Sequence, residues 1–109
     1  MDNLTTEKKE MQVSETLRLL ADIVSDLEAS GVGIIHAQAS KEPYVLITRE
    51  KDAFRVWALK NDLPVYMEPA EVTEPDYDLR WKVGAVFHGV DIHGYMTDAG
   101  KEEWDREAV

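Results

Sequence analysis

Two periods of apolar and polar residues run along this chain, and they predict its helices and strands. The first apolar positions recur every three or four residues, at Val13, Leu17, Leu20, Val24 and Leu27. This spacing is typical of one apolar helix face. We place the helix from about Glu10 to Ala29 and end it at Gly31, because glycine accepts the left-handed conformation of a cap. The stripe is expected to pack on a sheet, and a seam between two copies of the helix is the alternative.

The segments 32–38 and 44–48 predict two strands joined by a loop of hairpin length, with Pro43 just before the second strand. A helical pattern follows over 49–60, and Thr48 is its expected N-cap. Short strand, helix and strand segments in succession favour a parallel crossover, with the next strand at 65–67.

The predicted crossover helix places Ala53, Val56 and Trp57 on one face, with Phe54 beside it. Asn61 suits a left-handed stop directly after this helix. We expect the apolar face, Trp57 included, to lie in the core.

The clearest alternation of the chain runs over residues 79–96. A two-residue turn at His88 and Gly89, which tolerate positive φ, pairs two strands in one register. The predicted core-face pairs are Phe87 with Val90, Ala85 with Ile92, Val83 with Gly94, and Trp81 with Met96. This register predicts a buried Trp81, and it directs Asp91 and His93 to the opposite face, which we expect to be exposed.

A short acidic helix over 98–107 follows, with Thr97 or Asp98 as its cap and Trp104 as its large apolar anchor. The order is then α-β-β-α-β-β-β-α. It predicts an α+β fold with a mixed, mainly antiparallel five-stranded sheet and N-terminal, crossover and C-terminal helices. Residues 1–9 are expected to form a flexible tail, and residues 10–109 a single domain.

Charge changes this picture by excluding classes of partner. The 109 residues include 12 basic and 22 acidic side chains, a formal net charge of −10. Such a field repels phosphate backbones and anionic lipids, so we expect neither direct nucleic-acid binding nor membrane binding. With no apolar run of membrane length and no apolar secretory signal, the expected location is the cytoplasm. The acidity serves solubility, or it meets a basic protein surface, including by imitating nucleic acid.

Candidate chemistry is sparse. The chain has no cysteine, no nucleophile motif and no glycine-rich phosphate loop, so neither a catalytic residue nor a cofactor is predicted. His88, Asp91 and His93 fall close together in the sequence, but the hairpin register places His88 in the turn. It leaves Asp91 and His93 on the outer face, and a closed metal site needs further ligands. His36 would add a ligand only if its strand were adjacent to theirs.

The predicted binding site is the loop over 68–78, which is rich in acids and contains Pro69 and Pro75. Prolines stiffen it, and a stiff loop loses less entropy on docking than a flexible one. Tyrosine offers a large contact area at low entropic cost. The candidate binding residues are Glu71, Glu74, Asp76, Tyr77 and Asp78.

The segments 19–22 (Leu-Leu-Ala-Asp) and 48–50 (Thr-Arg-Glu), with the 79–96 hairpin, give the chain features similar to those of small uncharacterised acidic proteins of actinobacterial phages and prophages. The resemblance implies an accessory protein that binds host machinery in the host cytoplasm. Our leading prediction is therefore a non-enzymatic module that binds a basic protein surface. The alternatives are a homo-oligomer through the first helix, and a small enzyme or ligand-binding domain that uses the face bearing Asp91 and His93.

Overall fold

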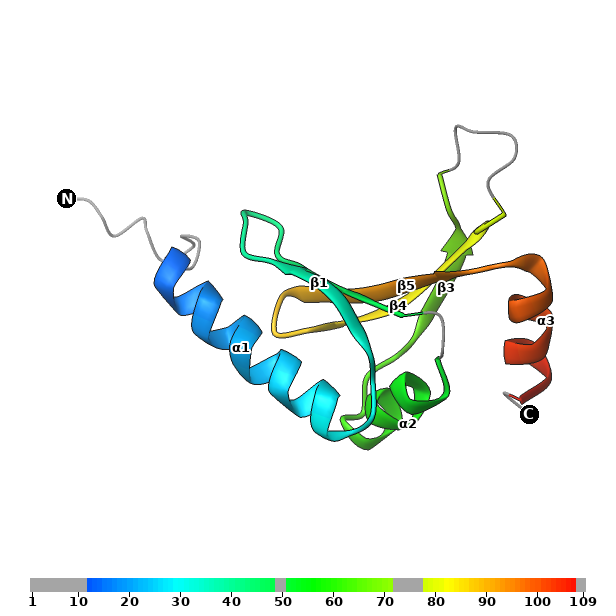
Figure 1. Ribbon diagram of the computed structural model, residues 1–109, viewed down its shortest axis with the longest axis horizontal. Helices are drawn as coiled ribbons and strands as arrows, with labels where there is room; N and C mark the ends of the chain where they lie inside the picture. The colour runs from blue at the N-terminus through cyan, green and yellow to red at the C-terminus, as the bar shows by residue number, and fades with distance from the viewer. Residues whose placement is uncertain (1–11, 49–50, 72–77, 108–109) are drawn as a thin grey trace.

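The computed structural model describes residues 12–48, 51–71 and 78–107 (Figure 1). The elements are α1 (Val13–Ala29), β1 (Ile34–Gln38), β2 (Tyr44–Ile47), α2 (Asp52–Lys60), β3 (Tyr66–Pro69), β4 (Trp81–Phe87), β5 (Val90–Met96) and α3 (Asp98–Glu107). The predicted order of helices and strands is confirmed. The predicted tail at 1–9 lies outside the described residues.

The five strands form one sheet in the order β1-β2-β5-β4-β3. β2 and β5 are parallel, whereas the other neighbouring pairs are antiparallel. The predicted mixed, mainly antiparallel sheet is therefore confirmed. β2 and β3 point the same way, as a crossover through α2 requires, but β5 and β4 lie between them.

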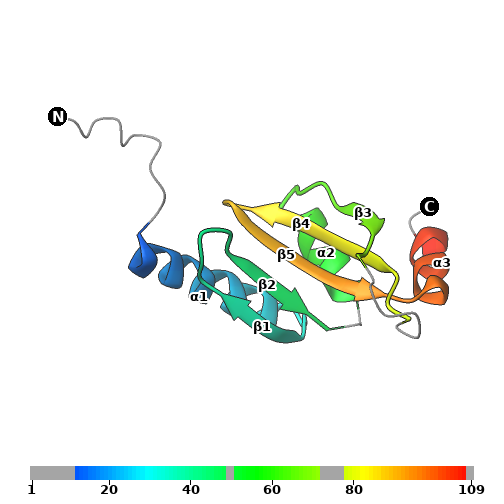
Figure 2. The same cartoon turned by 90° about the horizontal axis from the view of Figure 1, so that it is seen from above.

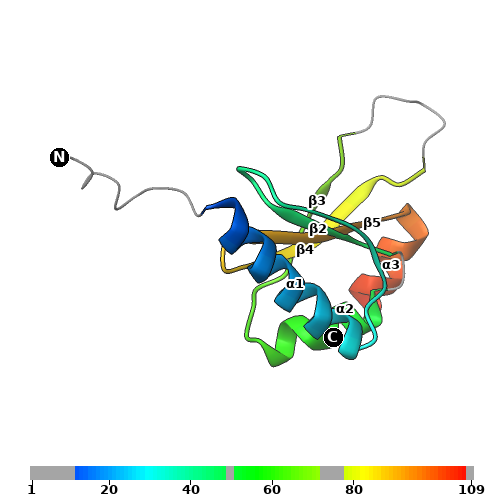
Figure 3. The same cartoon turned by 60° about the vertical axis from the view of Figure 1, so that its left-hand side comes forward.

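All three helices lie on one side of the sheet, α3 at the far end of β5 (Figures 1 and 3). We call this side the helix-side face. The opposite side, seen from above in Figure 2, carries no helix of the described chain, and we call it the open face. The core lies on the helix-side face and includes Leu20, Ile23, Leu27, Val45, Ile47, Phe54, Trp57, Ala85, Val90 and Ile92. Burial of these apolar side chains is the main force that holds the helices on the sheet.

At the N-terminal end of α1, the predicted apolar stripe differs by one position from the stripe that is buried. The buried residues are Thr16, Leu20, Ile23 and Leu27. Val13 and Leu17 are instead 68% and 54% exposed. Thr16 can occupy the buried stripe because its hydroxyl donates to the carbonyl of Gln12, at 3.2 Å, so its polar group keeps a partner.

The start of α2 also differs from the prediction. Thr48 does not cap the helix: its N–H donates to the carbonyl of Gly33 at 3.0 Å, just before the start of β1. The N-cap position is Lys51, whose side chain makes no capping hydrogen bond. Lys51 reaches back toward the sheet instead, where it lines a pocket between α2 and α3.

The buried face of α2 consists of Phe54, Trp57 and Ala58. Val56, predicted on this face, is exposed because Phe54 and Ala58 take the positions beside Trp57. The prediction for Trp57 is confirmed, and its indole N–H donates to Asp26 of α1 at 2.6 Å. The left-handed residue after the helix is Asp62 (φ 58°) rather than Asn61, whose amide donates to the Trp57 carbonyl.

The register of the β4–β5 hairpin is confirmed at all four predicted pairs. His88 and Gly89 have φ of 52° and 81°, as the predicted two-residue turn requires. Three burial predictions for this hairpin are wrong. His93 is only 8% exposed, and Asp91 is half-buried. Trp81 is half-buried rather than in the core, and its indole contacts α3.

Helix α3 is held at its start by its N-cap and by a contact with Trp81 of β4. The Thr97 hydroxyl accepts the N–H of Gly100 at 3.0 Å, which confirms Thr97 as the cap. The Trp81 indole donates to Asp98 at 2.7 Å, and the ammonium of Lys101 lies 4.6 Å from the centre of a Trp81 ring.

Candidate functional site

The predicted acidic loop is described only at its two ends. Glu71 and Asp78 are exposed, and Glu74, Asp76 and Tyr77 lie outside the described residues. The two ends are brought together by the β3–β4 pairing, which the N–H of Ala70 extends by donating to the Arg80 carbonyl at 2.8 Å. That this loop binds a partner stays a prediction.

The open face carries a polar cluster centred on Asp91. Tyr66 of β3 donates its hydroxyl to Oδ1 of Asp91 at 2.6 Å. The ammonium of Lys82, from β4, lies 3.6 Å from Oδ2 of Asp91. Nδ1 of His93 lies 2.8 Å from the same oxygen, although the angle there is not that of a hydrogen bond. Strand β3 and the β4–β5 hairpin thus place four polar side chains together.

Gly84 is what allows Tyr66 to reach Asp91. Gly84 of β4 stands between the two, opposite Tyr66 on one side and His93 on the other. A Cβ at Gly84 would lie 2.6 Å from the Tyr66 hydroxyl and 2.5 Å from the Ile92 carbonyl oxygen. The tyrosine side chain therefore crosses β4 only because this position has no side chain.

The cluster shifts the ionisation of two of its members. Burial alone would raise the pKa of Asp91, but the contacts from His93 and Tyr66 and the charge of Lys82 outweigh it, so the pKa lies below its ordinary value. Burial raises the pKa of Tyr66 well above its ordinary value, and the hydrogen bond to Asp91 adds to this. The cluster thus favours an ionised Asp91 beside a neutral Tyr66.

His93 is buried by rings on its own face. Its ring centre lies 5.6 Å from that of Tyr44 and 5.5 Å from that of Tyr95, and His36 lies 5.7 Å from Tyr44. β2 separates β1 from β5, and its Tyr44 ring lies next to both imidazoles, between His36 and His93. Among residues 12–48, 51–71 and 78–107, no group of three or more histidine or acidic side chains could hold a metal.

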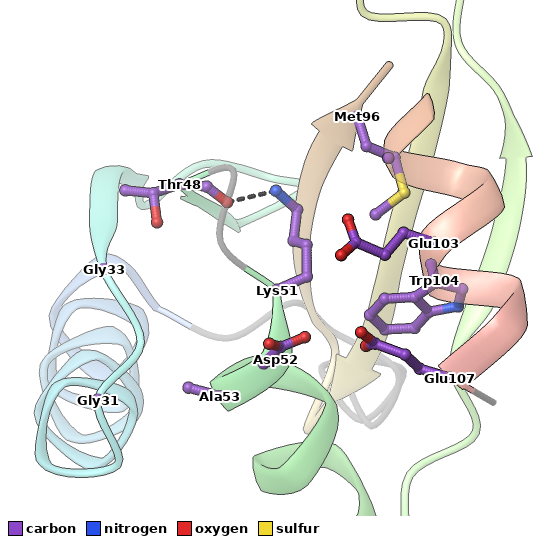
Figure 4. Close-up of a pocket in the computed structure, with 11 residues that line it drawn as sticks. Gly31, Gly33, Thr48, Lys51, Asp52, Ala53, Met96, Glu103, Trp104 and Glu107 are labelled. Carbon is purple, nitrogen blue, oxygen red and sulfur yellow. Dashed lines mark hydrogen bonds between the residues drawn. The ribbon is translucent and has the colours of Figure 1, made fainter. Parts of the chain in front are cut away.

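A second candidate site is a pocket of about 680 Å³ that α2 and α3 share with the segment before β1 (Figure 4). Its lining includes Thr48, Lys51, Asp52, Glu103, Trp104 and Glu107. The sequence did not predict this site, because its residues come from segments about fifty positions apart along the chain.

The inner wall of the pocket contains a buried lysine. Lys51 is 5% exposed, and its ammonium donates to the carbonyl of Thr48 and, at 3.2 Å, to that of Tyr95. Gly94 makes room for this side chain, since a Cβ there would lie 2.7 Å from Cε of Lys51. The ammonium is therefore committed to backbone oxygens of the sheet.

Arg55 of α2 ties α3 to the body of the protein at this pocket. Its guanidinium donates to the Trp104 carbonyl at 2.8 Å and lies 3.5 Å from the centre of a Trp104 ring. It also lies 3.9 Å from a carboxylate oxygen of Glu107. As predicted, Trp104 is the apolar anchor of α3, packed against the core. The stacked arginine fixes the spacing of the two helices.

The rim of the pocket is acidic. Asp52, Glu103 and Glu107 are exposed, and Figure 4 shows their carboxylates pointing into the same space from two helices. Like charges at i and i+4, as at Glu103 and Glu107, oppose each other on a helix. That spacing was the one local signal of this site in the sequence. The arrangement can accept a cationic group, which would relieve the repulsion between the carboxylates.

No helix among the described residues has both the length and the apolar character needed to cross a bilayer. Comparisons of the chain with protein-family models, with curated proteins and with solved structures found no match. The function is therefore argued from the geometry and charge of these two sites.

Proposed function

We propose that this chain is a non-enzymatic binding protein whose acidic surface engages a basic surface of another protein. The pocket between α2 and α3 receives a lysine or arginine side chain of that partner. The observation that carries the proposal is the convergence of three exposed carboxylates, from Asp52, Glu103 and Glu107, on one pocket.

The charges favour a cationic occupant over an anionic one. The rim supplies three carboxylates, of which Glu107 lies 3.9 Å from the Arg55 guanidinium. The ammonium of Lys51 lies buried against two carbonyl oxygens. The net charge of −10 adds long-range attraction for a basic partner, which speeds encounter more than it tightens the complex. The same acidity suits imitation of nucleic-acid phosphates, and the resemblance to phage proteins favours a partner in host machinery.

Ligand binding or catalysis at the Asp91 cluster is less well supported. Both carboxylate oxygens of Asp91 already have close polar neighbours, namely Tyr66, Lys82 and His93. A ligand would have to displace one of these neighbours, which would leave a partly buried group without its partner.

The proposal is tested with a short peptide of alternating arginine and alanine, titrated calorimetrically at low salt. Changing Glu103→Gln and Glu107→Gln together should raise Kd by roughly 3–10-fold, because two rim charges each contribute up to about 1 kcal/mol. The same peptide with citrulline in place of arginine has the shape but no charge, and it should not bind.

The matched control carries Glu28→Gln and Glu102→Gln, which remove two exposed acids outside the pocket and give the same net charge. This control should bind the arginine peptide nearly as the unchanged protein does. Equal weakening by the two double variants would show diffuse attraction to the whole surface and would overturn the pocket assignment. Failure of the unchanged protein to bind at low salt would overturn the function.

A further inference from the structure

The two edges of the sheet are built differently. Edge strands expose unpaired backbone groups, and monomeric proteins protect them with charges, prolines or bulges. At one edge, β3 has four residues, includes Glu68 and ends at Pro69. At the other edge is β1, and no strand of the described chain pairs with its outer side (Figure 2).

The β1 edge lacks charged protection. Residues 29–40 contain no Asp, Glu, Lys or Arg, although 31% of the chain is charged. Ile35 is 62% exposed. It lies at an irregularity in the β1–β2 register, between Ile34 and His36. Such a bulge twists the strand and so partly protects this edge from pairing with another strand. His36 to Gln38 beyond it pair regularly with β2 and keep an outer edge open to a further strand.

The exposed apolar residues of α1 lie on the same side of the molecule as this edge. Asp26 accepts the Trp57 N–H, so the α1 flank bearing Asp26 faces α2. At 100° per residue, Val13 and Leu17 project from the flank opposite Asp26. That flank faces away from α2 and runs along β1, against which α1 packs (Figure 2). The N-terminal part of this flank is apolar, Glu28 lies on the same flank three turns further on, and the flank adjoins the uncharged edge of β1.

We propose that two copies of this chain associate through this surface, with β1 pairing antiparallel to β1 of the second copy. The α1 flanks bearing Val13 and Leu17 then pack against each other about the same two-fold axis. A second copy fits because an unprotected edge strand is self-complementary in antiparallel pairing. Since each copy carries a charge of −10, two copies repel each other least at the β1 edge, where residues 29–40 contain no acid. Leu20 and Leu27, predicted for a helix seam, are buried within the chain and take no part.

This inference is independent of the proposed pocket function, and the two respond to salt in opposite directions. Salt screens the attraction between an acidic pocket and a basic partner, which weakens that complex. Salt also screens the repulsion between two acidic copies, which strengthens the dimer.

The test is the mass of the full chain by sedimentation equilibrium across a dilution series, at low and moderate salt. We expect a dimer that dissociates on dilution and is tighter at the higher salt. Ile35→Lys and Leu17→Lys should each raise the dissociation constant roughly tenfold or more, since each would bury an unpaired charge at the interface. Both residues are exposed in the single chain, so circular dichroism should show unchanged folding.

The control is Leu59→Lys on α2, which changes another exposed leucine to the same charge away from β1 and should leave the dimer intact. Backbone pairing itself is read from hydrogen exchange: amides 36–38 should become less protected on dilution. A chain that is monomeric at every concentration, or a dimer that Ile35→Lys and Leu17→Lys leave unchanged, would overturn the proposal. An effect of Leu17→Lys alone, with exchange at 36–38 independent of dilution, would overturn the strand pairing.

Discussion

The helix-side face and the open face of the sheet both bury side chains, but by different means. On the helix-side face, Val45, Ile47 and Ile92 are at most 2% exposed because helices cover them. On the open face, His93 reaches similar burial with no helix above it, between the rings of Tyr44 and Tyr95. Alternation along a strand therefore assigns a residue to a face, whereas its neighbours on that face decide how deeply it is buried.

Each face also uses a glycine of the β4–β5 hairpin to admit a long polar side chain. Gly94 leaves room for Lys51 on the helix-side face, and Gly84 leaves room for Tyr66 on the open face. In both cases the polar end finds its partners beyond the glycine: backbone carbonyls for Lys51, and Asp91 for Tyr66. The two glycines are therefore packing positions rather than turn residues.

The largest expected effect tests whether the helix-side face depends on α1. Leu20→Glu should unfold the domain, because a carboxylate at this 4% exposed position would lose its hydration without gaining a partner. The measurement is the far-ultraviolet circular dichroism and thermal transition of the purified variant. Leu17→Glu, three positions away on the exposed flank, should keep the native spectrum. A folded Leu20→Glu variant would show that the domain does not need α1 packed on the sheet.

Local rules explain how far the sequence could predict this structure. The register of the hairpin follows from alternation and from the turn at His88 and Gly89, both of which are local. The rotation of α1 was not predictable, because Thr16 is buried through a hydrogen bond to its own helix. The acidic pocket was invisible for another reason: Asp52 and Glu103 meet only after β5 has placed α3 beside α2. The charge-free run at 29–40 is readable in the sequence, but its meaning depends on β1 being an edge.

A smaller effect is expected at the glycine of the open face. Gly84→Ala should destabilise the domain by about 1–3 kcal/mol in urea unfolding, because the added methyl would clash with the Tyr66 side chain and the Ile92 carbonyl. Strand propensity alone predicts the opposite, since alanine normally improves on glycine there. Adding Tyr66→Ala should recover part of the loss from the clash. A Gly84→Ala variant that is more stable than the unchanged protein would show that Tyr66 is not held in place across β4.

The smallest effect concerns the charge at the centre of the open face. The pKa of Asp91 is lower in the folded protein than its ordinary value, so its ionised form stabilises the fold. This contribution is fully present above the unfolded pKa of about 3.9 and is lost as the pH falls through the lower folded value. Asp91→Asn should therefore reduce the free energy of unfolding by about 1 kcal/mol at neutral pH, a modest figure because Asp91 is partly exposed to solvent.

The pH dependence separates this charge effect from a simple loss of packing. The stability difference between the unchanged protein and Asp91→Asn should shrink as the pH falls from about 5 toward 2, since only the unchanged protein then loses the ionised carboxylate. Urea unfolding at several pH values measures it. The control Asp22→Asn removes an exposed acid of α1 and the same unit of net charge, so it corrects for general repulsion. If the Asp91→Asn difference stays constant or grows as the pH falls, Asp91 contributes by shape or hydrogen bonding alone. The open face would then resemble the helix-side face in depending on packing rather than charge.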